Sequence, residues 1–191
     1  MLIDDGSGQG FKAKVDSRLN LHTRSFSLSQ QHAISSAEEE AYQVNTSIAI
    51  AASEVKLLLL KNTHLTKELV ITYIQLETIG AAASNATAMW KIYAGGDYAS
   101  GGGAVTPVNM NVGSPNSATG SFYDATGSTI VTSGSPLEID RTHLANTRIS
   151  FNKEGSVILP RNGVLLISFT GSTAAGSAVA RVSFYYDIPE S

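Results

Sequence analysis

Apolar positions recur at every second residue in two clear segments of the chain, residues 42–50 and residues 180–188. Successive side chains of a strand point to opposite faces of a sheet, so this spacing predicts half-buried strands. Residues 55–60 and 69–71 are apolar at consecutive positions. That pattern predicts central strands that are covered on both faces.

Shorter segments of the same kind follow along the chain, separated by Gly-, Asn- and Pro-rich turns. Residues 61–64 are predicted to form a turn, and Pro160-Arg161-Asn162-Gly163 is predicted to close a hairpin, because Asn-Gly favours tight β-turns. Residues 141–146 are assigned to a single helical turn. Further strands are predicted at residues 72–77, 88–93, 105–112, 121–123, 128–131, 148–151, 156–159, 164–169 and 179–187.

Roughly eight to ten short strands without a long amphipathic helix are typical of an all-β fold. We therefore expect a jelly-roll-like two-sheet β-sandwich over residues 42–191, preceded by an extended N-terminal arm over residues 1–41. No repeat of fixed period is present, which argues against a solenoid or a propeller.

The N-terminal arm is rich in charge and poor in large apolar residues. Its glycines at residues 6–10 predict a flexible segment, because glycine costs much backbone entropy to order. Ser36 and Glu39 have the spacing of a capping box and predict a short helix of one or two turns. Such a segment buries too little apolar surface to fold alone, so we expect it to become ordered on a neighbouring protein. The candidate partner-binding residues are Phe11, Val15, Arg18, Leu19, Leu21, Arg24, Phe26 and Leu28.

Charge and composition narrow the classes of partner. The 13 Lys and Arg residues are scattered and the net charge is -3, whereas a nucleic-acid groove concentrates cations, so no nucleic-acid partner is expected. The chain has no cysteine, which excludes disulfides and thiolate metal sites. No apolar run is long enough to span a bilayer and no secretory signal is recognisable, so we expect no membrane contact and assembly in a host cytoplasm.

The sequence offers few candidate catalytic or metal-binding residues. The four histidines lack the i, i+2 or i, i+4 spacing of a metal pair, and no Gly-x-Ser-x-Gly motif is present. The adjacent acids in the arm do not predict a glycosidase pair. We therefore expect no catalytic residue, no metal and no cofactor. Trp90 is interpreted as a core residue rather than a sugar-stacking platform, and Tyr98, among glycines, is the candidate for an exposed loop contact.

Three motifs give the chain a resemblance to a known type of protein. They are AEEEAYQVNT at residues 37–46, SEVKLLLLKN at residues 53–62 and ELVIT at residues 68–72, followed by a Gly- and Asn-rich middle at residues 94–137. In this order they resemble the head decoration (cement) type of tailed-bacteriophage virion structural protein. The resemblance implies a virion location, a homotrimer and the major capsid protein as partner.

The functional expectation from the sequence is a non-enzymatic virion structural protein that decorates or cements the capsid. The alternative is a tail, collar or fibre component that binds a host-surface glycan, through Tyr98 and residues 94–137, or another tail protein. The third hypothesis is that the protein is an enzyme such as a depolymerase, but the sequence contains no acid pair or nucleophile motif that favours it.

Overall fold

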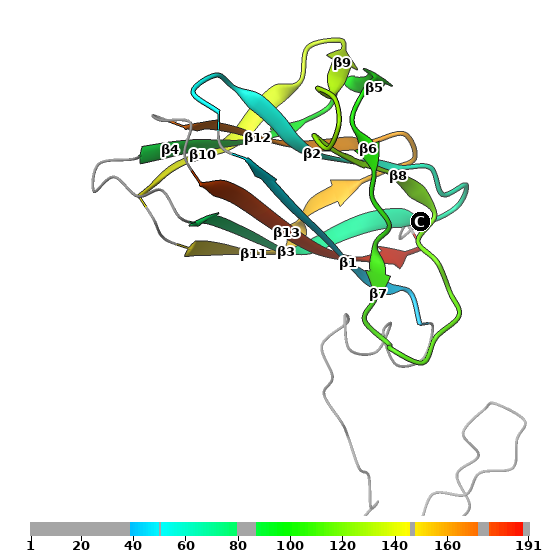
Figure 1. Cartoon of the computed structure of the whole chain (residues 1–191). Coiled ribbons are helices and arrows are strands. Elements are labelled where there is room, and N and C mark those ends of the chain that lie inside the picture. Colours follow the sequence, from blue (N-terminus) through cyan, green and yellow to red (C-terminus); the bar gives the residue numbers. More distant parts are fainter. Residues whose placement is uncertain (1–38, 50, 80–86, 146–147, 172–175, 189–191) are drawn as a thin grey trace, which may run out of the picture.

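Thirteen β-strands form two facing sheets and a short two-stranded ribbon (Figure 1). A computed structural model describes residues 39–49, 51–79, 87–145, 148–171 and 176–188. These residues contain strands, turns and bends but no helix. The prediction of an all-β sandwich is therefore confirmed, whereas the partner-binding residues and the short helix proposed in the arm lie outside the described residues.

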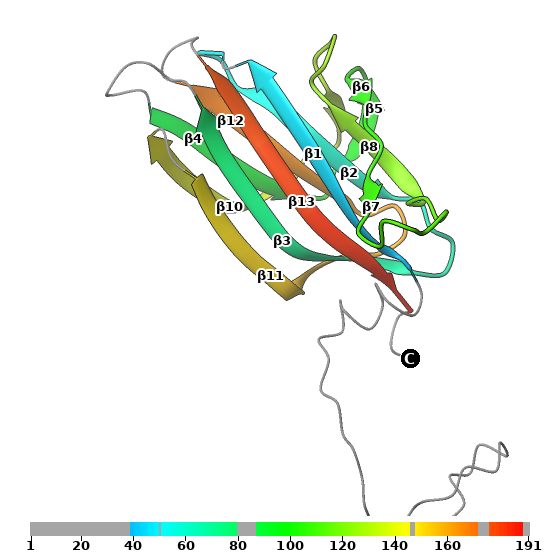
Figure 2. The same ribbon diagram turned by 60° about the horizontal axis from the view of Figure 1, so that its bottom comes forward.

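The first sheet has five strands in the order β11-β3-β13-β1-β7, and every neighbouring pair is antiparallel (Figure 2). The pairing of β1 with β13 is continuous from Ala41 opposite Tyr185 to Ala49 opposite Ser177. The strands are β11 (Arg148–Leu159), β3 (Glu68–Ile79), β13 (Ser177–Asp187), β1 (Ala41–Ala49) and β7 (Val108–Asn109).

The second sheet has six strands in the order β10-β4-β12-β2-β8-β6, again all antiparallel. The separate ribbon pairs β5 (Asp97–Ser100) with β9 (Val131–Ser133). The strands of the second sheet are β10 (Leu137–Ala145), β4 (Thr87–Ala94), β12 (Val164–Gly171), β2 (Val55–Asn62), β8 (Gly120–Asp124) and β6 (Gly103–Ala104).

Eight strands of eight or more residues make up the body of the sandwich, namely β1 to β4 and β10 to β13. Consecutive strands of this set lie in opposite sheets, except β4 and β10, which are neighbours in the second sheet. Because the chain crosses between the sheets so often, each sheet is built from segments far apart in sequence. The region between β4 and β10 holds the short strands and includes two further crossings, from β6 to β7 and from β7 back to β8 (Figure 1).

The main core lies between the sheets and is built by alternate residues of the long strands. Trp90 is fully buried and its ring meets the ring of Phe169 edge-on, with centroids 4.9 Å apart. At the other end of the core, the ring of Tyr42 stacks on Phe184 and meets Tyr186 edge-on. The interpretation of Trp90 as a core residue is thus confirmed.

A second, smaller cluster lies on the outer face of the six-stranded sheet. Leu59, Val164 and Leu166 are buried there against Ile130 from the region between β4 and β10. This region therefore covers part of the outer face, which explains why residues 57–60 are apolar at consecutive positions.

Two turn predictions are wrong in part. Residues 160–163 do form a turn, in which the Gly163 nitrogen donates to the Pro160 carbonyl at 2.7 Å and Asn162 has a φ of 66°. The turn connects β11 to β12, however, and these strands belong to different sheets, so it is not a hairpin. Residues 61–64 are not all in a turn either, because β2 continues through Asn62.

Other local predictions also need correction. Residues 141–145 are not helical but belong to β10, because β4 offers them a long partner strand from Thr87 to Ala94. Of the strand predicted at residues 105–112, only β7 (Val108–Asn109) is present, because residues 105–107 carry the chain from β6 in one sheet to β7 in the other. The strand predicted at 128–131 begins only at Val131, and Ile188 lies beyond the end of β13 and is exposed.

Candidate protein-binding edge

Strand β1 presents half of its backbone to one free edge of the five-stranded sheet. In an antiparallel pair, alternate residues direct their N–H and C=O groups to opposite sides of the strand. The Glu40 carbonyl accepts from the Tyr186 nitrogen of β13, whereas the Ala41 carbonyl accepts from the Met110 nitrogen just beyond β7. Even-numbered residues of β1 therefore pair with β13, and odd-numbered residues point away from it.

Strand β7 covers only the first part of that outward side, opposite Tyr42 and Gln43. By the same alternation, Asn45, Ser47 and Ala49 direct their backbone N–H and C=O groups outward. No strand among the described residues pairs with them. We call the segment Val44–Ala49 the β1 edge.

The β1 edge lacks the features that usually protect an edge strand from association, which are charged residues, proline and bulges. Its sequence is VNTSIA and its pairing with β13 has no irregularity. The other long edge strands differ. β10 has a register shift between Glu138 and Asp140 with ion-paired side chains, and β11 has a shift between Asn152 and Val157. The β1 edge is therefore the unprotected long edge of the described sandwich.

Exposed apolar side chains lie beside the β1 edge. Val108, Met110 and Val112 are 64%, 45% and 95% exposed. Together with Gln43, Asn45 and Asn109 they line a shallow groove of about 270 Å³. Exposed apolar side chains that gather next to unpaired backbone groups are the combination that an added strand from another protein requires.

The N-terminal arm joins the sandwich at the start of β1, beside β7. The Asn109 side chain in β7 donates to the Glu39 carbonyl at 2.7 Å, and Lys67 forms an ion pair of 2.6 Å with Glu40. Glu39 has a φ of 56°, so the backbone turns sharply just before β1 begins. The point at which the arm leaves the body is thus fixed beside β7.

Tyr98 does not lie in an exposed loop. It belongs to β5, is half-buried, and its ring stacks on Tyr123 with centroids 4.0 Å apart and the planes nearly parallel. Its hydroxyl donates to the Gly101 carbonyl at 2.9 Å. The ring thus packs against the small outer cluster, with one of its faces covered by Tyr123.

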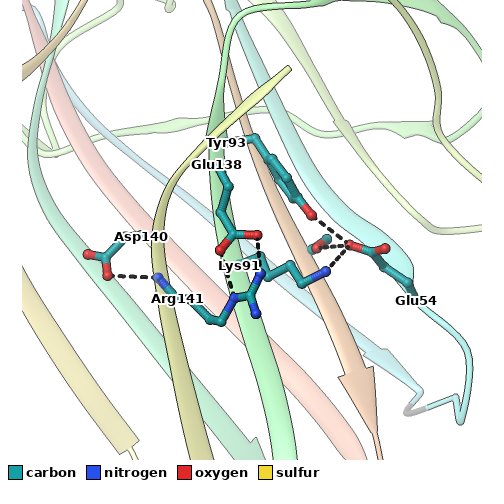
Figure 3. A network of polar contacts seen from close by, with 7 residues as sticks. Glu54, Lys91, Tyr93, Glu138, Asp140 and Arg141 are labelled. Carbon is teal, nitrogen blue, oxygen red and sulfur yellow. Dashed lines mark hydrogen bonds and ion pairs between the residues drawn. The ribbon is translucent and has the colours of Figure 1, made fainter. Parts of the chain in front are cut away.

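A charged network lies on the outer face of the six-stranded sheet, where three neighbouring strands bring together residues far apart in sequence (Figure 3). Glu54, just before β2, accepts hydrogen bonds from Ser168 of β12 at 2.6 Å and from the Tyr93 hydroxyl of β4 at 3.0 Å. Lys91 of β4 lies 3.7 Å from the same carboxylate. On β10, Arg141 donates two hydrogen bonds to Glu138 at 2.7 and 2.8 Å.

The contacts of this network keep Glu54 and Glu138 ionised, which does not suit them to act as proton-transfer groups. The hydrogen bond from Ser168, helped by Tyr93 and Lys91, lowers the pKa of Glu54. The hydrogen bond from Arg141 likewise lowers the pKa of Glu138. A carboxylate with a lowered pKa is a weak base at neutral pH, so the contact between Ser168 and Glu54 does not favour an activated nucleophile. The geometry fits a role in holding three strands and the start of β2 together.

Within the described part of the chain, no three His, Asp or Glu side chains gather closely enough to hold a metal ion. No helix in that part is long and apolar enough to cross a membrane. No protein-family model matches the chain, and comparison with curated proteins finds no match either.

The β1 edge was not among the sites predicted from the sequence. The absence of charge over residues 44–49 is visible there, but many central strands share it. Only the strand order shows that this uncharged strand lies next to a two-residue partner and therefore at an edge.

Proposed function

We propose that this protein is a non-enzymatic virion structural protein that decorates or cements a tailed-phage capsid by binding the major capsid protein. The observation that carries the proposal is the β1 edge, an uncharged segment whose outward backbone has no partner strand among the described residues and lies beside the exposed side chains of Val108, Met110 and Val112. Natural proteins protect such edges unless another chain covers them.

The binding mode that fits this edge is strand addition. An extended segment of the partner would lie along residues 44–49 and pair with the outward N–H and C=O groups of Asn45, Ser47 and Ala49. Apolar side chains of that segment would cover Val108 and Val112. Main-chain hydrogen bonds supply affinity in this mode, and the groove beside β7 supplies selectivity.

The strand order supports the jelly-roll interpretation. Without the short strands, the sheets read β11-β3-β13-β1 and β10-β4-β12-β2, which is the connectivity of two Greek keys folded together. Jelly rolls are frequent in viral capsid proteins, so this fold favours a virion role by analogy, although one fold serves many functions.

The N-terminal arm provides a second proposed contact. It is attached at Glu39, beside β7 and on the same strand as the β1 edge, so we propose that the arm and the edge engage the same neighbouring subunit. If the protein forms the trimer implied by the resemblance, three such attachments would bind with an avidity well above that of one.

The decisive experiment blocks strand addition without changing the fold. The backbone N–H of Ser47 points away from β13, so Ser47→Pro removes an outward donor and leaves the pairing with β13 intact. Ser47→Ala is the matched control, because it removes the same side chain and keeps the N–H. Full-length variants are mixed with purified heads that lack the protein, and the bound fraction is measured by co-sedimentation.

We expect Ser47→Pro to weaken head binding by about tenfold or more, since about 1–1.5 kcal/mol is lost with each main-chain hydrogen bond. Ser47→Ala should bind like the wild type, and both variants should keep the wild-type thermal unfolding midpoint to within a few degrees. Saturation of the heads by Ser47→Pro at wild-type concentrations would contradict the proposed edge. Immunogold label at the tail instead of the head would favour the tail or fibre alternative.

A further inference from the structure

Strands β1, β13 and β3 lie side by side in the five-stranded sheet (Figure 2). On the outer face of this sheet, opposite the side that packs on the core, they carry polar side chains at neighbouring positions. The register places Asn45 of β1 opposite Arg181 of β13, and Arg181 opposite Gln75 of β3. These three side chains thus form one row across the sheet. The next row contains Ser47, Val179 and Glu77.

Arg181 is held in a fixed position on this face. Its Nη1 atom donates to the Gln75 side chain and lies 3.3 Å from Glu77 Oε2. The Arg181 side chain is 36% exposed, and a guanidinium has five N–H donors, more than these two contacts use. A preorganised guanidinium loses less rotamer freedom on binding a ligand than a mobile one.

A shallow groove of about 440 Å³ lies beside Arg181. One part of its lining offers the amide of Asn45 and the hydroxyl of Ser47, both on exposed residues of β1. Another part is apolar and consists of Ile79, which is 48% exposed, with the buried Val179 also in the lining. The groove thus combines fixed donors and acceptors with an apolar surface.

We propose that this groove binds an uncharged oligosaccharide. A sugar ring presents neighbouring hydroxyls, which suit a guanidinium and an amide, and a C–H surface, which suits the exposed side chain of Ile79. Because Glu77 balances the charge of Arg181, the site favours neutral hydroxyls over phosphate or acidic sugars. The site is separate from Tyr98, where the sequence placed a glycan contact.

This inference is independent of the proposed binding to capsid protein, although Asn45 and Ser47 border both sites. Strand addition uses the backbone of β1, whereas the groove uses side chains on its outer face. A host-surface sugar bound here would let a head protein hold a particle near a cell surface, and the same groove would serve equally in a tail component.

The test is an NMR titration of the full-length protein with maltohexaose, cellohexaose, chitohexaose and mannohexaose, each separately, and with an acidic galacturonate oligomer. At least one neutral sugar should shift the backbone amides of Asn45, Ser47 and Arg181 saturably, with a Kd in the millimolar range. Titration to about 20 mM reaches well above such a Kd.

Arg181→Ala should weaken that binding about tenfold or more, which is the effect of losing a hydrogen bond from a charged group. Arg181→Lys should also weaken it, because an ammonium cannot reproduce the planar fork. Arg161→Ala, in the exposed turn after β11, is the matched control and should bind like the wild type. The thermal unfolding midpoint of each variant checks that it is folded.

Absence of a saturable shift with all four neutral sugars would overturn the proposal. Shifts confined to Tyr98 and Tyr123, or binding of the acidic oligomer alone, would overturn it as well. A failure here leaves the head-binding result of Ser47→Pro unaffected, and Arg181→Ala should bind heads normally, so the two proposals can fail separately.

Discussion

Asn62 is a buried polar residue whose replacement should reveal how the two sheets are connected at one end. It has no exposed surface, and its side-chain nitrogen donates to the Leu159 carbonyl at 2.9 Å and the Lys67 carbonyl at 3.0 Å. Its side-chain oxygen accepts from the His64 nitrogen at 2.9 Å. One side chain at the end of β2 thus satisfies backbone groups of β11 and of the loop that leads into β3.

The cost of Asn62→Ala follows from these three bonds. The Leu159 carbonyl is buried, and leaving it without a donor costs about 1–3 kcal/mol. The bonds to Lys67 and His64 are partly buried, so water can replace them, and each contributes about 0.5–1.5 kcal/mol. We therefore expect a loss of about 2–6 kcal/mol, a large part of the 5–15 kcal/mol that stabilises a typical domain.

Urea unfolding at 25 °C measures this loss, with the fluorescence of Trp90 as the probe. Trp90 is the single tryptophan of the chain and is fully buried, so its emission should change when the core opens. Asn45→Ala is the matched control, since Asn45 is exposed and its replacement should change the free energy of unfolding by less than about 0.5 kcal/mol. A loss for Asn62→Ala below about 1 kcal/mol would refute the reasoning.

Two further predictions concern other parts of the sandwich. Gly101→Ala should loosen the region between β4 and β10, because Gly101 has a φ of 77° and an added Cβ would lie 2.0 Å from the Thr129 carbonyl oxygen. Gly127→Ala is the control, because its Cβ would meet no atom within 4 Å and the change should cost only backbone strain. Limited proteolysis compares the two variants, and equal cleavage rates would contradict the steric argument. Because the pKa of Glu54 is lowered in the folded protein, its carboxylate stabilises the folded state at pH values above its ordinary pKa of 4.5. This stabilisation is lost as the pH falls through the lowered pKa. Wild type should therefore exceed Glu54→Gln in thermal midpoint at pH 7, and this difference should shrink below about pH 4; a difference constant with pH would show that charge is not its cause.

Local pattern was sufficient for much of the architecture. The alternation over residues 42–50 identified β1 and its buried face, and the apolar runs at 55–60 and 69–71 identified strands covered on both sides. These predictions succeed because the period of a strand and the burial of apolar groups act on neighbouring residues. Trp90 was assigned to the core for the same reason.

Predictions failed where a distant partner decided the outcome. Residues 141–145 form a strand because β4 lies beside them, although their own sequence permits a helical turn. Asn-Gly at residues 162–163 makes a turn, but the destination of the next strand, in the opposite sheet, depends on long-range packing. Asn62 looked like a turn residue, and only its contact with Leu159, 97 positions away, explains its burial.

The sequence by itself determined that the chain is an all-β protein, which residues face its core and where the uncharged strands lie, since these properties depend on side-chain chemistry and local periodicity. The tertiary structure alone decided which uncharged strand lies at an edge and which polar side chains share a face with Arg181. The physical reason is that an edge or a cross-strand row exists only once separate segments have paired. Every residue type except proline offers the same backbone donor and acceptor, so no single position encodes its partner.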